Sequence, residues 1–250
     1  MQNEKTEAVL IEGRNPVWEA IKAQRPMEKL YVAKTIDQQS VARILAAARR
    51  MKIKIEWVPK ERLDAFTTTG KHQGLIAVAS VHEYADLDEE LTRIQASGED
   101  PFIVLLDEIM DPYNLGAIIR SAGCAGAHLV VITQRHSVGL TGAVERASAG
   151  AIEHVPVCRV VNMAQCVENL ADRGIRCVAA VPGGKSLWQS DLDGPLALVI
   201  GNEGNGIRHL VQQRCQDVVG LPMKGKLDSL NASVAAGILM YEVFRQRLGQ

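Results

Sequence analysis

The apolar positions of the first 84 residues alternate between short runs and stripes with helical spacing. Short apolar runs, which are typical of strands, occupy Ala8–Glu12, Leu30–Ala33, Ile53–Val58 and Leu75–Val81. One helical stripe consists of Val41, Ile44, Leu45 and Ala48. Asn15 before Pro16 predicts the start of another helix, with Asn15 as its N-cap. The pattern therefore predicts a small α/β domain over residues 1–84.

The alternation becomes more regular from residue 101 to residue 250. Strands are expected at Phe102–Leu106, His128–Thr133, Cys177–Val181, Leu196–Ile200 and Val218–Leu221. Helices are expected at Leu115–Ala125, Leu140–Ser148, Met163–Asp172 and Ile207–Arg214. Strands that are apolar throughout and alternate with helices indicate a parallel sheet covered on both faces. The acidic, polar stretch 85–100, which ends just before Pro101, is interpreted as a linker that could include a short helix.

The last predicted helix, from about Asn231 to Arg247, is apolar over most of its circumference. Its apolar positions are Val234, Ala235, Ile238, Leu239, Met240, Tyr241, Val243 and Phe244. A helix of this kind needs burial on more than one side. A homodimer interface would provide the second contact.

Composition narrows the class of protein. The chain has 250 residues, of which 47% are hydrophobic and 23% charged, as in ordinary globular proteins. No apolar run approaches the ~18 residues needed to span a membrane. The polar stretch Met1–Thr6 lacks the apolar core of a signal peptide, which predicts a cytoplasmic protein. The five cysteines form no C-x-x-C pair and the six histidines are scattered, so no metal site is expected.

The net charge of −1 hides an uneven distribution. Residues 1–84 hold 14 Lys/Arg against 10 Asp/Glu, a surplus of 4, whereas residues 85–250 hold 14 against 19, a deficit of 5. The front third is therefore the better candidate to face phosphate groups, although a chance imbalance on a solvated surface would look the same.

Three segments follow strands of the predicted parallel sheet, where ligands of such sheets bind. They are Asp107–Arg120, Gly201–Gly206 and Leu221–Ser233. Each alone has a simpler interpretation: a helix cap with a surface arginine, a plain turn, and a basic loop before a helix capped by Ser229 or Asn231. The spacing G-x-x-G-x-G, with Glu203 inside it, differs from the dinucleotide-binding G-x-G-x-x-G and disfavours a nicotinamide-dependent oxidoreductase.

Together, the three segments resemble the ordered motifs of the SpoU/TrmH methyltransferases. The matching residues are Asn114-Leu115-Gly116 through Arg120, Gly201-Asn202-Glu203-Gly204-Asn205-Gly206, and Leu221-Pro222-Met223 through Ser229-Leu230-Asn231-Ala232-Ser233-Val234. This resemblance covers about residues 102–247. In the front part, Gly13–Val17 and His72–Gly74 resemble landmarks of the substrate-binding domain in the branch that methylates guanosine in large-subunit rRNA.

The resemblance implies a fold and an activity. It implies a deep trefoil knot in the C-terminal domain, a dimer through the knotted domains, and transfer of a methyl group from S-adenosylmethionine to a ribose 2′-hydroxyl of RNA, best matched by a guanosine of 23S rRNA. The residues implied to bind the cofactor are Gly201, Leu221 and Leu230, with Val181, Gly204, Ile207 and Met223 nearby.

The resemblance also implies the catalytic residues. Arg120 matches the family arginine for which a role as general base has been proposed. Deprotonating an arginine at pH 7 costs roughly 7–9 kcal/mol, because the reference pKa is about 12.5–13.8. Arg120 is therefore expected to act as a cation that binds the adjacent phosphate and stabilises the developing alkoxide. Asn114 and Glu203 should orient Arg120 and the ribose, and Ser229 and Asn231 should position the hydroxyl and the cofactor.

Three further residues are candidates for RNA contact, namely Arg14, Lys71 and Arg146, with solvated surface as the alternative. Other functions also remain open. The substrate could be tRNA or another rRNA site, and the chain could be a non-catalytic RNA-binding protein of ribosome assembly. Intact Arg120, Glu203, Ser229 and Asn231 argue against lost catalysis.

Overall fold

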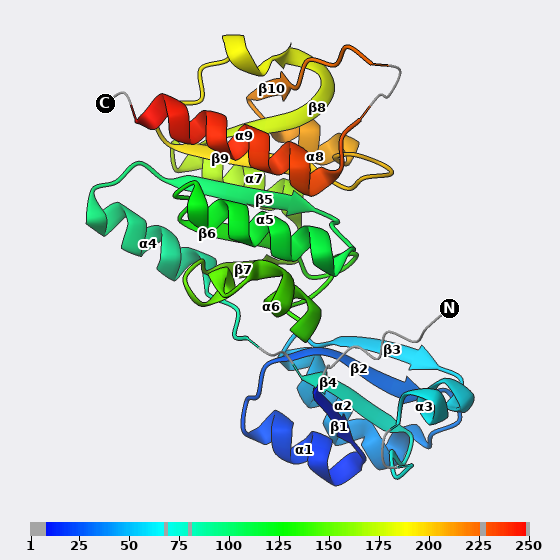
Figure 1. Ribbon diagram of the computed structural model, residues 1–250. Helices are drawn as coiled ribbons and strands as arrows, with labels where there is room; N and C mark the ends of the chain where they lie inside the picture. The colour runs from blue at the N-terminus through cyan, green and yellow to red at the C-terminus, as the bar shows by residue number, and fades with distance from the viewer. Residues whose placement is uncertain (1–8, 68–69, 80–81, 226–228, 249–250) are drawn as a thin grey trace. The chain divides into compact units, whose positions relative to one another are not determined.

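The computed structural model describes residues 9–67, 70–79, 82–225 and 229–248 (Figure 1). The chain forms two compact units. The first comprises residues 1–83 together with 139–142, and the second comprises residues 84–138 and 143–250. None of the helices in the described ranges is long and apolar enough to cross a membrane.

In the described residues, the first unit is a mixed sheet of four strands with three helices. Its elements are β1 (Val9–Glu12), α1 (Arg14–Lys22), β2 (Met27–Ala33), α2 (Gln38–Arg50), β3 (Lys54–Val58), α3 (Lys60–Phe66) and β4 (Leu75–Ala79). The strand order is β1-β4-β2-β3. β4 is antiparallel to both of its neighbours, whereas β2 and β3 are parallel. The carboxyl ends of β2 and β3 therefore lie at the same edge of the sheet.

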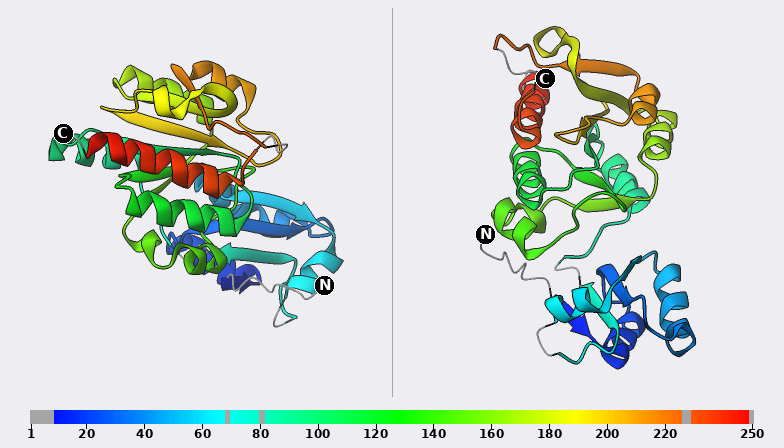
Figure 2. Two further views of the ribbon diagram at one scale, coloured as in Figure 1. Left: turned by 45° about the horizontal axis from the view of Figure 1, so that its top comes forward. Right: turned by 90° about the vertical axis from the view of Figure 1, so that its right-hand side faces the viewer.

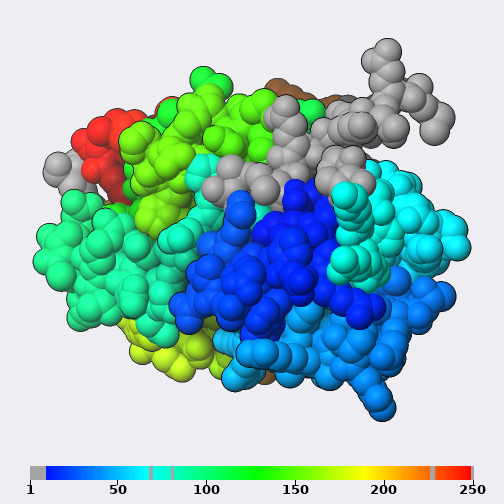
Figure 3. Space-filling view, turned by 90° about the horizontal axis from the view of Figure 1, so that it is seen from below, coloured from blue at the N-terminus to red at the C-terminus, as the bar shows by residue number. Residues whose placement is uncertain are grey.

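Helices α1 and α2 share one apolar core with the sheet of the first unit. Asp37 begins α2, because its carboxylate accepts hydrogen bonds from the backbone N–H groups of Gln39 and Ser40. The predicted stripe along α2 is buried and packs with Val17 of α1 against Leu30 of β2. The other side of α1 (dark blue) lies at the surface of the unit (Figure 3).

The second unit is built on a sheet of six strands. Its strands are β5 (Phe102–Asp107), β6 (Leu129–Thr133), β7 (Val157–Val160), β8 (Arg176–Ser186), β9 (Leu196–Gly201) and β10 (Asp217–Gly220). Its helices are α4 (Leu87–Ser97), α5 (Pro112–Cys124), α6 (Gly142–Ser148), η1 (Ala151–Glu153), α7 (Met163–Asp172), η2 (Leu187–Gln189), α8 (His209–Arg214) and α9 (Ala232–Arg247). The strand order is β10-β8-β9-β5-β6-β7, and every neighbouring pair is parallel.

The helices of the second unit cover both faces of its sheet, as the continuous apolar strands predict. α4, α7 and α8 lie on one face, and α5 and α9 lie side by side on the other (Figure 2). Every residue of β5 and β6 is buried. Because all the strands run in one direction, the loops that follow β5, β8, β9 and β10 meet at one edge of the sheet.

Several expectations about local structure were wrong. The stretch 85–100 is not a linker, because Leu91 and Ile94 of α4 belong to the core of the second unit. Asn15 is not a cap, since Gly13 occupies the N-cap of α1. Asn114 also caps nothing, because the carboxylate of Asp111 caps α5 and Asn114 lies inside the helix.

Strand limits also differ from the prediction. β7 was not predicted, and β8 continues to Ser186, five residues beyond its expected end at Val181. Its extension pairs with β10, where Gly184 approaches the backbone so closely that a Cβ atom there would lie 2.7 Å from the carbonyl carbon of Val219. The apolar pattern missed this extension because the residues from Pro182 to Ser186 include two glycines and a lysine. Ala8, Ser80 and Val81, which were placed in strands, lie outside the described residues.

Candidate active site

A cavity of about 400 Å³ lies at the carboxyl edge of the six-stranded sheet in the second unit. Its walls come from four stretches: the middle of β8, the end of β9 with its loop, the end of β10 with its loop, and the beginning of α9. The lining residues are Ala180, Val181, Pro182, Ile200, Gly201, Asn202, Glu203, Gly204, Asn205, Gly206, Val219, Gly220, Leu221, Met223, Ser229, Leu230, Ala232, Ala235 and Leu239. Apolar side chains and glycine backbone dominate, and Glu203 is the only ionisable group among these lining residues.

A chain of side-chain hydrogen bonds joins the three segments identified from the sequence. The Nδ2 atom of Asn114 donates to Oε1 of Glu203. The Nδ2 atom of Asn231 donates to Oδ1 of Asn114 at 3.0 Å. Asn114 is buried, so both of its bonds are shielded from water. The side chain of Asn114 therefore ties the loop after β9 to the start of α9.

The loop after β9 is held in shape by its own backbone and by Asn202. The N–H of Asn202 donates to the carbonyl of Gly206 at 3.1 Å, and the N–H of Gly206 donates back at 2.9 Å. The side chain of Asn202 donates to the carbonyl of Glu108 at 3.0 Å, which anchors the loop to the end of β5. A Cβ atom on Gly201 would lie 2.2 Å from the carbonyl carbon of Gly206, so this position accepts only glycine without a backbone shift.

A buried carboxylate anchors the other end of the same loop. Asp107, the last residue of β5, is fully buried. It accepts hydrogen bonds from Nη2 of Arg208 at 2.6 Å, from Nε at 3.0 Å and from the backbone N–H of Arg208 at 2.9 Å. The hydrogen bond to Asp107 raises the pKa of the Arg208 guanidinium, which is therefore cationic throughout the physiological range. The two residues form a charge-assisted ion pair that connects β5 to the start of α8.

The structure brings most of the predicted cofactor residues together. Those that line the cavity are Gly201, Leu221, Leu230, Val181, Gly204 and Met223. Ile207 does not line it. Its side chain is buried in the core on the face of the sheet that α4, α7 and α8 cover.

The predicted catalytic residues divide into two groups. Glu203 and Ser229 line the cavity, and Asn114 and Asn231 connect its walls. Arg120 is exposed on α5, six residues after Asn114, which places it about 240° around the helix from that side chain. Among the described residues, no hydrogen bond or ion pair joins Arg120 to Asn114, Glu203 or Asn231. Asn114 and Glu203 therefore bind each other in this chain.

The first unit has a second, larger cavity of about 620 Å³ at the shared edge of β2 and β3. Arg14 and Lys71, two of the predicted RNA-contacting residues, line it. Its lining residues are Arg14, Ala33, Thr35, Ile36, Asp37, Lys60, Asp64, Gly70, Lys71, His72, Gln73 and Gly74. Arg146 belongs to the second unit, where it is exposed in the last turn of α6.

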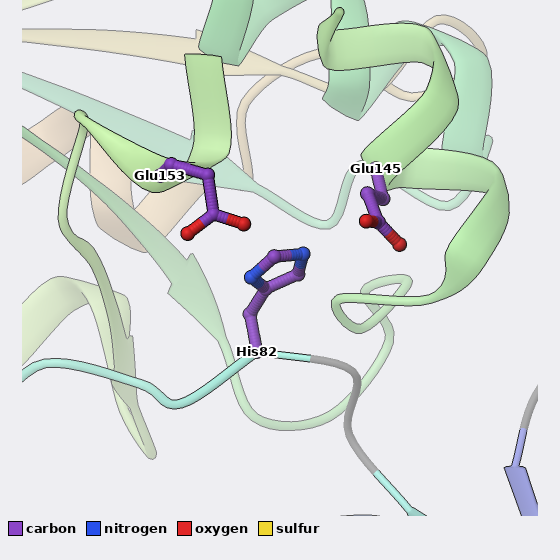
Figure 4. A group of neighbouring side chains, drawn as sticks. All are labelled: His82, Glu145 and Glu153. Carbon is purple, nitrogen blue, oxygen red and sulfur yellow. The ribbon is translucent and has the colours of Figure 1, made fainter. Parts of the chain in front are cut away.

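Within either unit, no three His, Cys, Asp or Glu side chains of the described residues lie close enough together to hold one metal ion. Figure 4 draws His82 with Glu145 and Glu153. His82 belongs to the first unit and both glutamates belong to the second, so these side chains do not constitute a site of either unit. The absence of a metal site stays a prediction.

Sequence reasoning missed the residues that support the two cavities. Asp107 and Arg208 were given no role, and neither were Lys60 and Asp64. A usable signal existed for two of them. Asp107 ends a buried strand, and Lys60 lies two residues after the last residue of β3, at the edge of a parallel sheet where ligands bind. No sequence signal pointed to Arg208, whose partner Asp107 lies 101 residues away, or to Asp64, whose partner His72 lies eight residues further along the chain.

Comparisons with known proteins agree with this arrangement of two units. The SpoU rRNA Methylase family model matches residues 101–241, and the model of the RNA 2′-O ribose methyltransferase substrate-binding domain matches residues 10–85. The chain belongs to the SpoU methylase family. YacO of Bacillus subtilis, assigned to the TrmH family of tRNA/rRNA methyltransferases, is 45% identical over 237 residues, which are 94% of each chain.

Other relatives extend the comparison to solved structures. A TrmH family protein of Staphylococcus aureus (strain MSSA476) is 41% identical over 242 residues, 96% of this chain and 97% of that one. The crystal structure of the SpoU methyltransferase AviRb from Streptomyces viridochromogenes, in complex with AdoMet, is 27% identical with a TM-score of 0.61. The match covers 96% of this chain and 91% of AviRb. The family membership therefore extends over both units.

Proposed function

We propose that this chain transfers a methyl group from S-adenosylmethionine to a ribose 2′-hydroxyl of RNA, with a guanosine of large-subunit (23S) rRNA as its target. One observation carries the proposal. Two of the three segments that match the family motifs line one cavity, and Asn114 of the third segment joins them by hydrogen bonds. The AdoMet complex of AviRb supports the choice of cofactor.

The cavity of the second unit fits such a cofactor. Its volume of about 400 Å³ lies within the ~300–1,000 Å³ of small-molecule sites, and its walls are largely apolar, as those sites are. Gly201 and Gly220 bring backbone to the cavity wall without side chains in the way, and Leu221 and Leu230 supply apolar surface. When bound, the cofactor supplies a methyl group that its positive sulfur already activates.

The polar residues at the cavity would then bind and orient the ribose hydroxyl, which must lose its proton as the methyl group is transferred. Ser229 lies at the wall of the cavity and can hydrogen bond to the hydroxyl. Glu203 is held by Asn114, which leaves its second carboxylate oxygen for the ribose. Arg120 is assigned the role of a cation for the neighbouring phosphate.

A homodimer is part of the proposal. Helix α9 buries Ala236, Leu239 and Met240 within the chain, but Val234, Ile238 and Tyr241 are 50%, 36% and 50% exposed. These three side chains follow each other at i, i+4 and i+7 and so form one apolar stripe on the outer face. A second copy would bury this stripe. Since α5 lies beside α9, the exposed Arg120 would then lie near the dimer interface. It would contact RNA there without a hydrogen bond to Asn114.

The remaining family features belong to the same proposal. We place a deep trefoil knot in the second unit, formed by the stretch from β10 to α9. Support comes from the cavity wall, where the loops after β9 and β10 and the start of α9 lie together around the middle of β8. We also place the protein in the cytoplasm. In the proposed domain division, residues 1–84 form an RNA-binding unit and residues 101–250 form a methyltransferase unit, to which α4 is added.

A methyl-transfer assay tests the proposed reaction. The full chain is incubated with radiolabelled S-adenosylmethionine and unmodified large-subunit rRNA, and the methylated nucleotide is mapped. Label at a ribose 2′ position is expected, as is loss of that methylation in cells lacking the protein. RNA binding without any transfer would instead indicate a non-catalytic role in ribosome assembly.

Arg120→Ala tests the assignment of the arginine. Turnover should fall by about 10²–10³-fold, the typical cost of removing one group that stabilises a transition-state charge, while calorimetry shows nearly unchanged cofactor affinity. Arg50→Ala, an exposed arginine of α2, is the matched control. Turnover of Arg120→Ala within tenfold of the parent would remove the residue from the mechanism.

A second candidate substrate is tRNA. A solved structure concerned with 2-OH methylation of C/U34 on tRNA is 27% identical, with a TM-score of 0.55, and matches 60% of this chain and 99% of that one. The same assay with unmodified tRNA decides between the substrates, because only the true substrate should be methylated to completion.

A further inference from the structure

The two faces of the four-stranded sheet in the first unit are covered unequally. Helices α1 and α2 pack on the face that carries Leu30. The opposite face carries Tyr31 and packs against Leu63 of the short helix α3. Four neighbouring positions of β2 and β3 on this second face are only partly buried, namely Lys29, Tyr31, Lys54 and Glu56. This face therefore keeps contact with solvent.

Tyr31 and Phe66 form a stacked aromatic pair on this face. Their ring centroids are 5.3 Å apart, and the angle between the ring planes is 30°. Phe66, the last residue of α3, is nevertheless 39% exposed. A ring that rests on a second ring and still meets water offers a flat surface on which another planar group can stack.

The guanidinium of Arg62 lies beside both rings. Its central carbon, Cζ, is 5.8 Å from the ring centroid of Tyr31 and 5.6 Å from that of Phe66. Because these two distances nearly equal the distance between the rings, Arg62 lies next to the pair and not across Phe66 from Tyr31. The side of the Phe66 ring turned away from Tyr31 is therefore not covered by Arg62, in agreement with its exposure.

The end of α3 is fixed, which holds the ring of Phe66 in place. Leu63, three residues earlier, is fully buried against the sheet. The hydroxyl of Thr67 donates to Oε2 of Glu12 at 2.6 Å and accepts from the N–H of Gly70 at 2.8 Å. A ligand that stacks on a surface already held in position loses little of its affinity to ordering the protein.

Positive charge exceeds negative charge around the aromatic pair. Three cations on this face, Lys29, Lys54 and Arg62, stand against two carboxylates, Glu12 and Glu56. Glu56 forms ion pairs with Lys29 at 3.1 Å and with Arg62 at 3.2 Å. One positive charge is therefore in excess beside the rings. An exposed aromatic ring next to surplus positive charge is typical of surfaces that bind single-stranded nucleic acid.

We propose that Phe66, supported by Tyr31, is a stacking site for an unpaired base of the RNA substrate. The proposal rests on the proposed function, which supplies the RNA. Both rings lie within residues 10–85, which match the substrate-binding family model. Proteins that recognise RNA sequence mostly bind unstacked bases, often on aromatic side chains. The bases of a duplex cover each other's faces, so a duplex cannot use this site.

The experiment compares three variants of the full chain. Phe66→Leu keeps an apolar side chain and removes the aromatic face, whereas Phe66→Tyr keeps the ring. Trp188→Leu is the control for losing an exposed ring elsewhere, because Trp188 lies in η2 of the second unit and is 60% exposed. Circular dichroism checks that all three variants are folded.

Affinity is measured by fluorescence anisotropy with a single-stranded RNA of about ten nucleotides, within the usual site size of ~4–16. A duplex of the same sequence and an abasic strand of the same length are the control ligands. Phe66→Leu should bind the single strand about tenfold more weakly than the parent, whereas Phe66→Tyr and Trp188→Leu should stay within about twofold. The slope of log affinity against log salt should not change in Phe66→Leu, because no phosphate contact is removed.

Three results would overturn the proposal: single-strand affinity of Phe66→Leu within about twofold of the parent, an equal loss on the abasic strand or the duplex, or an equal loss in Phe66→Tyr. Failure of the proposed function looks different. If the parent methylates no RNA but Phe66→Leu still loses single-strand affinity, the methyl transfer is rejected and the stacking site is retained.

Discussion

The two cavities follow the same rule of position and differ in chemistry. Both lie at the carboxyl edge of parallel strands, one after β9 and β10 and the other after β2 and β3. The first is walled by leucines, valines and glycine backbone, and the second by arginine, lysine and carboxylates. The sheet therefore determines where a ligand can bind, and the residues of the loops determine which ligand it is.

The cavities also differ in how they are supported. The strand β5 at the centre of the second unit is buried along its whole length, and its last residue, Asp107, anchors the loop after β9. In the first unit, four of the five residues of β3 are only partly buried. We therefore expect changes at the second unit's cavity to act through precise loop geometry, and changes at the first unit's cavity to act mainly through charge.

The largest effect is expected from Asn114→Ala. The change removes the two hydrogen bonds that join Asn114 to Glu203 and Asn231, which contribute about 0.5–1.5 kcal/mol for the neutral pair and about 1.5–3 kcal/mol for the one to the carboxylate. At 1.36 kcal/mol per factor of ten, kcat for methyl transfer should fall about 10²–10³-fold. Asn169→Ala, on the exposed side of α7, should leave kcat unchanged. A kcat within about threefold of the parent would show that the hydrogen-bond chain does not matter.

Gly201→Ala should come next, with a smaller effect that concerns the cofactor. The added Cβ would lie 2.2 Å from the carbonyl carbon of Gly206 and 2.3 Å from the nitrogen of Ile207, so the loop backbone must move. Cofactor affinity measured by calorimetry should fall about tenfold or more, since strain from overpacking typically costs 1–3 kcal/mol. Gly237→Ala on α9, where the nearest atom would be 3.8 Å away, is the control. Equal affinities would mean that this loop adapts freely.

Arg208→Ala should have a moderate effect on stability. Losing the partner of a buried carboxylate costs about 3–5 kcal/mol, but the Arg208 side chain is 45% exposed and its backbone N–H still donates to Asp107. We expect the free energy of unfolding in urea to fall by about 1–2 kcal/mol after this discount for solvent screening. Arg173→Ala, which removes an exposed ion pair with Asp88, should cost about 0.5 kcal/mol or less. Similar losses of unfolding free energy in the two variants would contradict the stabilising role assigned to the ion pair between Asp107 and Arg208.

The smallest effect is expected from thiol alkylation, because most of the thiols are buried. All five cysteines lie in the second unit, so the extent of their modification measures how rigid that unit is. Burial raises the pKa of the Cys158, Cys166 and Cys215 thiols to about 12, so at pH 8 only about one in 10⁴ is the reactive thiolate. Cys124 is exposed. Mass spectrometry should find a single modification, absent in Cys124→Ser. Rapid modification of Cys158 would reveal local opening of the sheet.

The sequence was sufficient for the parts of the fold that depend on near neighbours. The apolar runs of β5, β6 and β9 and the stripe of α2 identified these elements within about two residues, because burial repeats with the period of the local structure. Of the two capping candidates for the last helix, Ser229 and Asn231, the structure shows Asn231 as the N-cap. The prediction of a cap failed at Asn114, where Asp111 and Pro112 provide a better start three residues earlier.

The amino-acid sequence by itself determined the order of strands and helices. It also determined that the three segments lie near one edge of the sheet, since parallel strands bring their carboxyl ends together. Only the tertiary structure decided that Asn114 bridges Glu203 and Asn231, which are 89 and 117 residues away in the chain. It also decided that Ile207 faces the core and that Arg120 faces outward. These outcomes depend on the angle at which separate elements pack, and no local pattern of residues encodes that angle.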